Sequence, residues 1–203
     1  YPATQTWVEV VTPGPTERKD HAMVYSTKQN RTLLFGGTNS ASGNCLGSEC
    51  YFDESWEYDA SSKFWTETTG ADAPSRRREH AMAYDSARDR AVLFGGRFDT
   101  ADSGTCMDGS TSNQGVCGLG DTWIYDFVTH SWSEVTPLTA PPMRHNHAMA
   151  YDSHRDRILL FGGTIANASV TDCPTGFAEY RNSTCYFTDS WGTNCFKCCN
   201  GIT

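Results

Sequence analysis

The sequence lacks the features that would mark a membrane-spanning, helical or nucleic-acid-binding protein. No apolar run approaches the ~20 residues that a helix needs to cross a bilayer, and no stretch has the periodic apolar face of an amphipathic helix. Only 20% of the residues are charged, and 16 Lys and Arg against 24 Asp and Glu give a formal net charge of −8. This acidic balance disfavours nucleic acids and anionic membranes as partners.

Signals for catalysis and for targeting are also missing. The chain contains no Gly-x-Ser-x-Gly, His-Glu-x-x-His or P-loop pattern. It begins at Tyr1 without a charged and then apolar leader, which favours a processed chain or a fragment. Its 38% hydrophobic and 12% aromatic residues are nevertheless enough for a folded core, so a disordered tail is excluded.

What the sequence does contain is a threefold internal repeat. Each copy begins with His-Ala-Met, reaches a tyrosine, and after a polar turn enters an apolar run that ends in Phe-Gly-Gly. The three phenylalanines are Phe35, Phe94 and Phe161. A tryptophan follows each diglycine, and in the first two copies a second tryptophan comes nine residues later.

Each repeat is predicted to form four short β-strands. The His-Ala-Met-x-Tyr stretch alternates small and large side chains, and a continuous apolar run such as 158–161 is typical of a strand buried on both faces. Stretches around the two tryptophans, such as 123–126 and 131–135, predict a second hairpin. The diglycine indicates a backbone angle or a close approach that a Cβ would forbid. An extra copy of the last strand occupies residues 6–10.

These patterns resemble kelch repeats over about residues 4–191. The resemblance implies an all-β fold, a kelch-type β-propeller with one four-stranded antiparallel blade per repeat, hence about three blades plus an extra N-terminal strand. Residues 1–192 are then kelch repeats, and residues 193–203 a cysteine-rich tail that could begin another module. The matching residues are the diglycines 36–37, 95–96 and 162–163, the tyrosines Tyr25, Tyr84 and Tyr151, and the tryptophans Trp56, Trp65, Trp123, Trp132 and Trp191.

Three blades cannot close a ring, because propellers typically have about 4–8. Either further blades lie elsewhere in a longer chain, or two copies pair into six blades with each Trp7 strand completing the partner's last blade. Other assemblies, filaments included, are a third alternative.

Function is expected where the repeats differ, in the insertions between each diglycine and the next tryptophan. Because neighbouring strands alternate in direction, these insertions share one face with the connections between blades. The basic triplet 76–78 in one connection is either an anion site or a solvated loop, although Arg18 and Arg144 at matching places favour a repeated structural arginine. The connections are residues 13–20, 72–79 and 139–146.

The nine cysteines follow the same repeat, with one pair in each insertion. Local disulfides would explain this pattern, and free thiols in a reducing compartment are the alternative. Three cysteines remain, so at least one cannot pair within this chain. A metal site, a redox site and the start of a cysteine-rich module are the alternatives for them. The predicted pairs are Cys45 with Cys50, Cys106 with Cys117 and Cys173 with Cys185, and the remainder are Cys195, Cys198 and Cys199.

Three glycosylation sequons agree with an oxidising compartment. They begin at Asn30, Asn167 and Asn182, all in predicted exposed loops. Together with the disulfides they predict a secreted or cell-surface glycoprotein that carries N-linked glycans.

The favoured function is an extracellular structural or protein-interaction module, whose partner is another protein or neighbouring copies in a larger assembly. A glycan-binding propeller is the first alternative, with Tyr51, Phe52, Phe98 and Tyr180 as candidate aromatics. A galactose-oxidase-like enzyme fragment is less favoured, because His21, His80 and His147 occupy equivalent repeat positions and fit a structural role. Residues 108–113 miss the EF-hand spacing. We therefore expect no enzyme activity, cofactor or metal.

Overall fold

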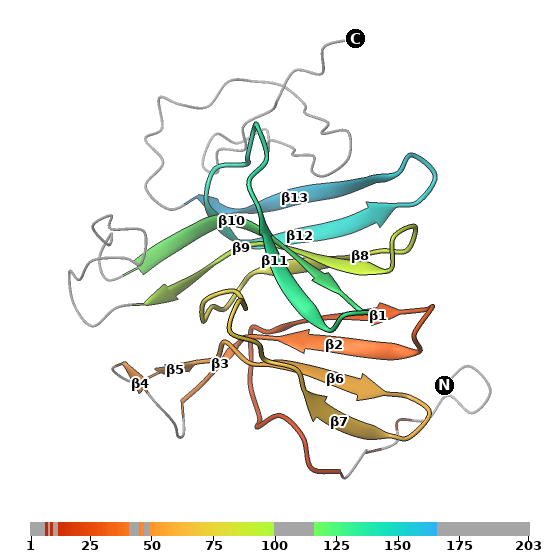
Figure 1. The fold of residues 1–203 in the computed structure, drawn as a ribbon. Coiled ribbons are helices and arrows are strands. Elements are labelled where there is room, and N and C mark those ends of the chain that lie inside the picture. The colour runs from red at the N-terminus through yellow and green to blue at the C-terminus, as the bar shows by residue number, and fades with distance from the viewer. Residues whose placement is uncertain are drawn as a thin grey trace, which may run out of the picture.

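The computed structural model describes residues 7, 9, 12–40, 45–46, 49–99 and 116–165, and these form β-strands joined by turns and loops. Figure 1 shows the larger sheets as successive layers along the molecule. Within the described part of the chain there is no helix that could cross a membrane.

Two sheets are complete antiparallel blades of four strands, as the sequence predicts. Blade 1 has the order β1-β2-β6-β7, and blade 2 has the order β11-β10-β9-β8. Blade 1 contains β1 (Ala22–Ser26), β2 (Arg31–Phe35), β6 (Ser55–Asp59) and β7 (Phe64–Glu67). Blade 2 contains β8 (Ala81–Asp85), β9 (Arg90–Asp99), β10 (Val116–Asp126) and β11 (Ser131–Val135).

Two smaller sheets complete the described fold. Blade 3 is represented by its first hairpin, β12 (Arg144–Asp152) and β13 (Arg157–Ile165). The first insertion forms a sheet of its own from β3 (Thr38–Asn39), β5 (Glu49–Tyr51) and β4 (Cys45–Leu46). The strand predicted over 6–10, the strands around Trp191 and the tail 193–203 lie wholly or largely outside the described residues.

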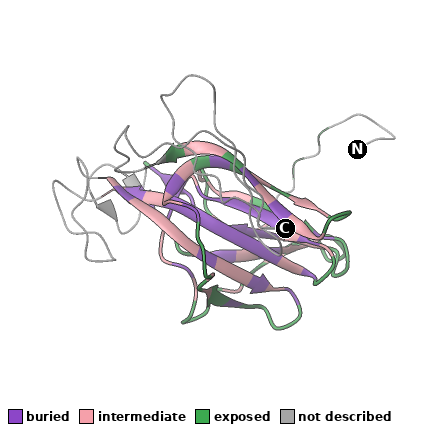
Figure 2. Cartoon of the chain, turned by 90° about the horizontal axis from the view of Figure 1, so that it is seen from above, coloured by how far each residue is buried: buried purple, intermediate pink, exposed green. Residues whose placement is uncertain are grey.

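The continuous apolar run of β9 is a buried strand because blades pack on both of its faces: Leu93 contacts blade 1 and Val92 contacts Ile158 of blade 3. Phe35 and Phe94 are 0% and 1% exposed, since aromatic side chains of the following blade cover them. The equivalent Phe161, in the last described strand, is 56% exposed. In Figure 2 the buried residues, in purple, lie mainly on the strands, and the exposed residues, in green, lie mainly in the turns and loops.

Polar turns join the strands of each hairpin, as the sequence predicts. The Asp85 carboxylate accepts hydrogen bonds from the backbone N–H groups of Ala87 and Arg88, at 3.1 and 3.2 Å. Asp152 does the same in blade 3. A residue with a positive φ angle ends each turn, and Asp89 (φ 56°) is one example. Asp and Asn tolerate this conformation better than most residues.

The strands differ from the prediction where they meet the diglycine. We expected the apolar strand to end there, but β9 continues to Asp99 and β13 to Ile165. In blade 2 the pairing resumes at the second glycine, with Gly96 opposite Leu119 and a register shift between Leu119 and Thr122. The second insertion therefore leaves the blade as a bent two-stranded extension.

Candidate interaction face

All the described inserted sequence lies on one side of the molecule, which we call the insertion face. It comprises the inter-blade connections, the β3-β5-β4 sheet and the β9–β10 extension beyond the diglycine. In Figure 1 this sheet and this extension project to the same side, opposite the short turns of the blades. The predicted separation of insertions and short turns is therefore confirmed for the described residues.

In the first two repeats the two glycines make different close contacts. A Cβ on Gly36 would lie 2.7 Å from the carbonyl oxygen of Arg77 in the next connection. A Cβ on Gly37 would lie 2.9 Å from Cβ of His21 in its own blade. Both glycines have positive φ angles, 66° and 95°. The backbone angle and the close approach that the sequence offered as alternatives are therefore both present.

The repeated histidines are packing residues at the blade junctions. His80 and His147 are 6% and 7% exposed, and each ring meets the phenylalanine of the preceding blade edge-on at 5.5 and 5.6 Å. Burial lowers the pKa of His80 far below its ordinary value, and the Arg77 cation adds to the effect. Burial and Arg144 lower the pKa of His147 to about 3. Both side chains therefore pack as neutral imidazoles, which supports the predicted structural role.

A buried arginine recurs in each connection, as the sequence suggested. In Arg18, Arg77 and Arg144 the Nε–H donates to a carbonyl two residues earlier. In all three, Nη1 donates at 3.1 Å to the carbonyl of the first diglycine residue, eighteen positions later. Arg77 is 0% exposed and Arg78 is 7% exposed, so neither belongs to a solvated loop or a free anion site.

A carboxylate that the sequence analysis missed completes this arrangement. Asp121 binds Arg77 through both oxygens at 2.7 Å and accepts the indole N–H of Trp123, also at 2.7 Å. Glu54 makes the corresponding contacts with Arg18 and Trp56, at 2.8 and 3.0 Å. The available signal was an acidic residue two positions before each blade tryptophan, which is Asp189 in the third repeat.

A second ionic group, which we call the rim cluster, lies where the connections meet the β9–β10 extension. Glu79 is its centre, because its Oε2 is 2.8 Å from Nε of Arg97 and 2.7 Å from Nδ1 of His145. Burial alone would raise the pKa of Glu79, but His145 and Arg97 lower it to about 2. Arg78 extends the cluster through a 2.7 Å contact with Asp99. Its charges are largely balanced, which does not favour an anion site.

The three described cysteines, Cys45, Cys50 and Cys117, lie in strands, whereas the sequence predicts them in loops. Cys45 and Cys50 are directly opposite each other in β4 and β5, which favours the predicted local pairing. Cys50 and Cys117 are each disulfide-bonded. Cys106, Cys173 and Cys185 lie outside the described residues, so the three pairings stay predictions.

The described aromatics proposed for glycan binding are occupied in packing. Tyr51 is 8% exposed, and it shares a small core with Phe98 and Cys117 that joins the two insertions. The Arg18 guanidinium lies 4.1 Å from the centroid of the Phe52 ring. Tyr180 lies outside the described residues. These contacts leave the lectin-like alternative without a described aromatic platform.

Of the predicted glycosylation sites, Asn30 is described and the other two, Asn167 and Asn182, are not. Asn30 is exposed in the β1–β2 turn with a φ angle of 56°. Its amide donates to Ser61 at 2.9 Å and accepts the Tyr25 hydroxyl at 2.7 Å. One amide hydrogen remains for a glycan bond, so this geometry is compatible with a sequon in use.

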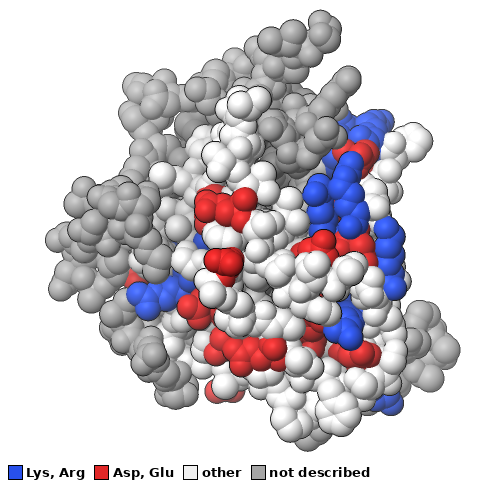
Figure 3. All heavy atoms as spheres, in the orientation of Figure 1, with Lys and Arg blue, Asp and Glu red and all other residues white. Residues whose placement is uncertain are grey.

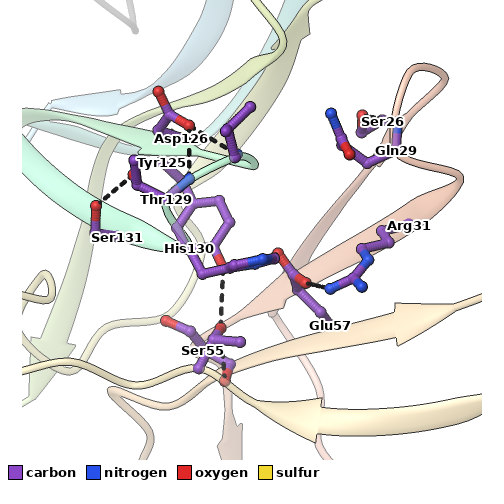
Figure 4. Close-up of polar contacts among 12 residues, drawn as sticks. Ser26, Gln29, Arg31, Ser55, Glu57, Tyr125, Asp126, Thr129, His130 and Ser131 are labelled. Carbon is purple, nitrogen blue, oxygen red and sulfur yellow. Dashed lines mark hydrogen bonds and ion pairs between the residues drawn. The ribbon is translucent and has the colours of Figure 1, made fainter.

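The junction of blades 1 and 2 also contains a polar contact that does not repeat. Glu57, 1% exposed, accepts hydrogen bonds from Arg31 at 2.7 Å and from the Tyr125 hydroxyl at 2.8 Å, and it lies 3.0 Å from Nδ1 of His130 (Figure 4). Blade 2 has Ile124 at the same position relative to its tryptophan. The His130 ring is thus part of a blade junction.

The described surface offers no metal centre. No group of three or more His, Cys, Asp or Glu side chains in the described residues could hold an ion. In Figure 3 most Lys and Arg follow the turn-bearing rim, where they alternate with acids, whereas several acidic side chains on the front have no basic neighbour. The front is therefore the more acidic of these two regions.

Successive four-stranded antiparallel sheets, joined by repeated glycine, histidine and arginine contacts, define an open segment of a β-propeller. The family model for the KLHDC2/KLHL20/DRC7 Kelch-repeats domain matches residues 2–174, and the chain belongs to this kelch-repeat family. It is also similar to Mei4-dependent protein 6 of Schizosaccharomyces pombe (strain 972 / ATCC 24843), with 24% identity over 155 residues.

That match covers 74% of this chain and 20% of the relative's length. Kelch-repeat domains are generally protein-interaction modules rather than enzymes. The kelch resemblance and the all-β fold predicted from the sequence are therefore confirmed. The proposed boundary between residues 192 and 193 stays a prediction.

Proposed function

We propose that the chain is a structural or protein-interaction module of a secreted or cell-surface glycoprotein, and that its partners contact the insertion face. The observation that carries this proposal is the division of the sequence between the two sides of the fold. Repeated residues are used in blade junctions, whereas the described sequence that differs between repeats lies on one face. Loops on a rigid scaffold are common binding sites.

A site-specific photo-crosslinker tests which face binds. We expect a benzophenone amino acid at Asp72, exposed in the connection between blades 1 and 2, to give a discrete crosslinked product with extracellular proteins of the source organism. Excess unlabelled chain should compete the product away. The same group at Arg155, exposed in a short turn, is the matched control. Equal products from both positions, or a product from Arg155 alone, would contradict the assignment of the face.

The extracellular part of the proposal rests on the cysteine pairs and the sequons, and it has its own measurement. After expression through a eukaryotic secretory pathway, the intact mass should fall on enzymatic deglycosylation by at least two N-glycans. The substitution Asn30→Gln should remove one of them. A mass unchanged by deglycosylation would contradict a glycoprotein.

A further inference from the structure

A pocket opens on the insertion face between the connection 72–79, which joins blades 1 and 2, and the outer part of blade 2. Trp123, Leu119 and Met143 contribute apolar walls, and Asp121 and Glu134 contribute carboxylates. The residues that line it include no Lys or Arg. Such a pocket favours a ligand that has a flat apolar face and a positive charge.

The pocket exists in blade 2 because this repeat departs from the others. When the repeats are aligned on the blade tryptophan, Gly118 and Gly120 stand where the first repeat has Tyr51 and Asp53. Tyr51 packs against Phe98 and Cys117 of the second insertion and is 8% exposed. A Cβ on Gly120 would lie 3.2 Å from Cα and Cβ of Met143. Side chains at these two positions would therefore narrow or close the pocket.

The two carboxylates of the pocket are not equivalent. Asp121 is neutralised by its two 2.7 Å contacts with Arg77, and it fixes the indole of Trp123 through a further hydrogen bond. Glu134 lies directly opposite Trp123 on β11 and is exposed. No hydrogen bond or ion pair joins Glu134 to any other described residue. An oriented indole and an uncompensated carboxylate therefore lie side by side on one face of the sheet.

We propose that this pocket binds an arginine side chain of a protein partner. A guanidinium is planar, so it can stack on an indole while its N–H groups donate to a neighbouring carboxylate. An ammonium group is a strongly hydrated point charge and would use the apolar walls less well. The proposal rests on the proposed interaction function, because it names what the insertion face recognises.

The test follows the indole N–H signal of Trp123 in the ¹⁵N-labelled full chain, with Trp123→Phe used only to assign that signal. The probe is the peptide acetyl-Gly-Arg-Gly-amide, and its uncharged counterpart carries citrulline in place of arginine. We expect a saturable shift with a Kd on the order of millimolar, as suits one buried side chain. The citrulline peptide should bind at least about fivefold more weakly, since a charge-assisted hydrogen bond is lost.

Two variants locate the site, with a matched control. Glu134→Gln should weaken binding about as much as citrulline does, whereas Glu67→Gln, which changes the acid opposite Trp56 in blade 1, should leave it unchanged. Gly118→Tyr should abolish binding while the other indole signals stay in place. Equal binding of both peptides, no shift of the Trp123 signal, or full binding by Gly118→Tyr would overturn the proposal. If any of these results occurred together with a crosslink from Asp72, the arginine pocket would be refuted, but the insertion face would still be the binding surface.

Discussion

Gly95→Ala is expected to lower the free energy of unfolding by roughly 3 kcal/mol or more, as the sum of backbone strain and overpacking. Gly95 has a φ angle of 64°, which an alanine adopts with strain. The added Cβ would lie 2.5 Å from the carbonyl oxygen of Arg144 and 3.2 Å from the His147 ring. The nearest obstacle is backbone of the next blade, so relief requires blades 2 and 3 to separate. Denaturant unfolding of the full chain measures the loss.

Gly162→Ala is the matched control, because it changes the same residue of the repeat in blade 3. Gly162 also has a positive φ angle, 79°, but a Cβ there would meet no atom of the described residues within 4 Å. We expect it to cost only the backbone strain, about 1–2 kcal/mol. If both variants lost the same free energy, the close approach between blades would contribute nothing, and the interpretation of the first glycine would be wrong.

The diglycines illustrate how far the sequence alone could go. Their repetition predicted either an unusual backbone angle or a close approach, and it predicted the strands on either side. It could not show that Gly36 faces the next blade while Gly37 faces its own. That difference depends on how blades stack. A one-dimensional pattern does not contain the relative placement of segments that are distant in sequence.

The arginines show the same limit in the candidate site. Arg18 and Arg144 suggested a structural residue, yet the triplet around Arg77 still resembled an anion site or an exposed loop. The structure shows that Arg77 is a structural residue. It donates to the Gly95 carbonyl and the Asp121 carboxylate, which lie on strands 18 and 44 residues away in sequence. The acid was visible as a residue two positions before each tryptophan. Only the fold shows that one carboxylate serves both the arginine and the indole.

Insertions were the least predictable part of the chain. Their cysteine pairs indicated stapled loops, but the structure places Cys50 and Cys117 in strands that lengthen or flank the blades. Hydrogen bonding of the backbone explains this outcome, since a hairpin leaving a blade edge satisfies more backbone groups as strands than as loops. The pocket beside Trp123 was also invisible, because it results from missing side chains at Gly118 and Gly120.

Acidification from pH 6.5 towards pH 4.5 is expected to lower the free energy of unfolding by about 2–3 kcal/mol per pH unit. Each of the two buried histidines contributes ~1.4 kcal/mol per pH unit to this slope. His80 and His147 have folded pKa values below the ordinary 6.5, in the latter case about 3. The unfolded chain therefore binds more protons than the folded chain. The stability that these neutral rings contribute is fully present above pH 6.5 and is lost as the pH falls.

The carboxylates act in a lower range, so the two effects can be separated. Glu79, with a folded pKa of about 2, contributes stability above its ordinary pKa of 4.5 and loses that contribution as the pH falls below it. The double variant His80→Asn, His147→Asn should be less stable at pH 7 but should show a much flatter slope between pH 6.5 and 4.5. His154→Asn, in an exposed turn, should keep the wild-type slope. An equally steep slope in the double variant would mean that other groups take up the protons, and that the histidines at the blade junctions are not the acid-sensitive part of the fold.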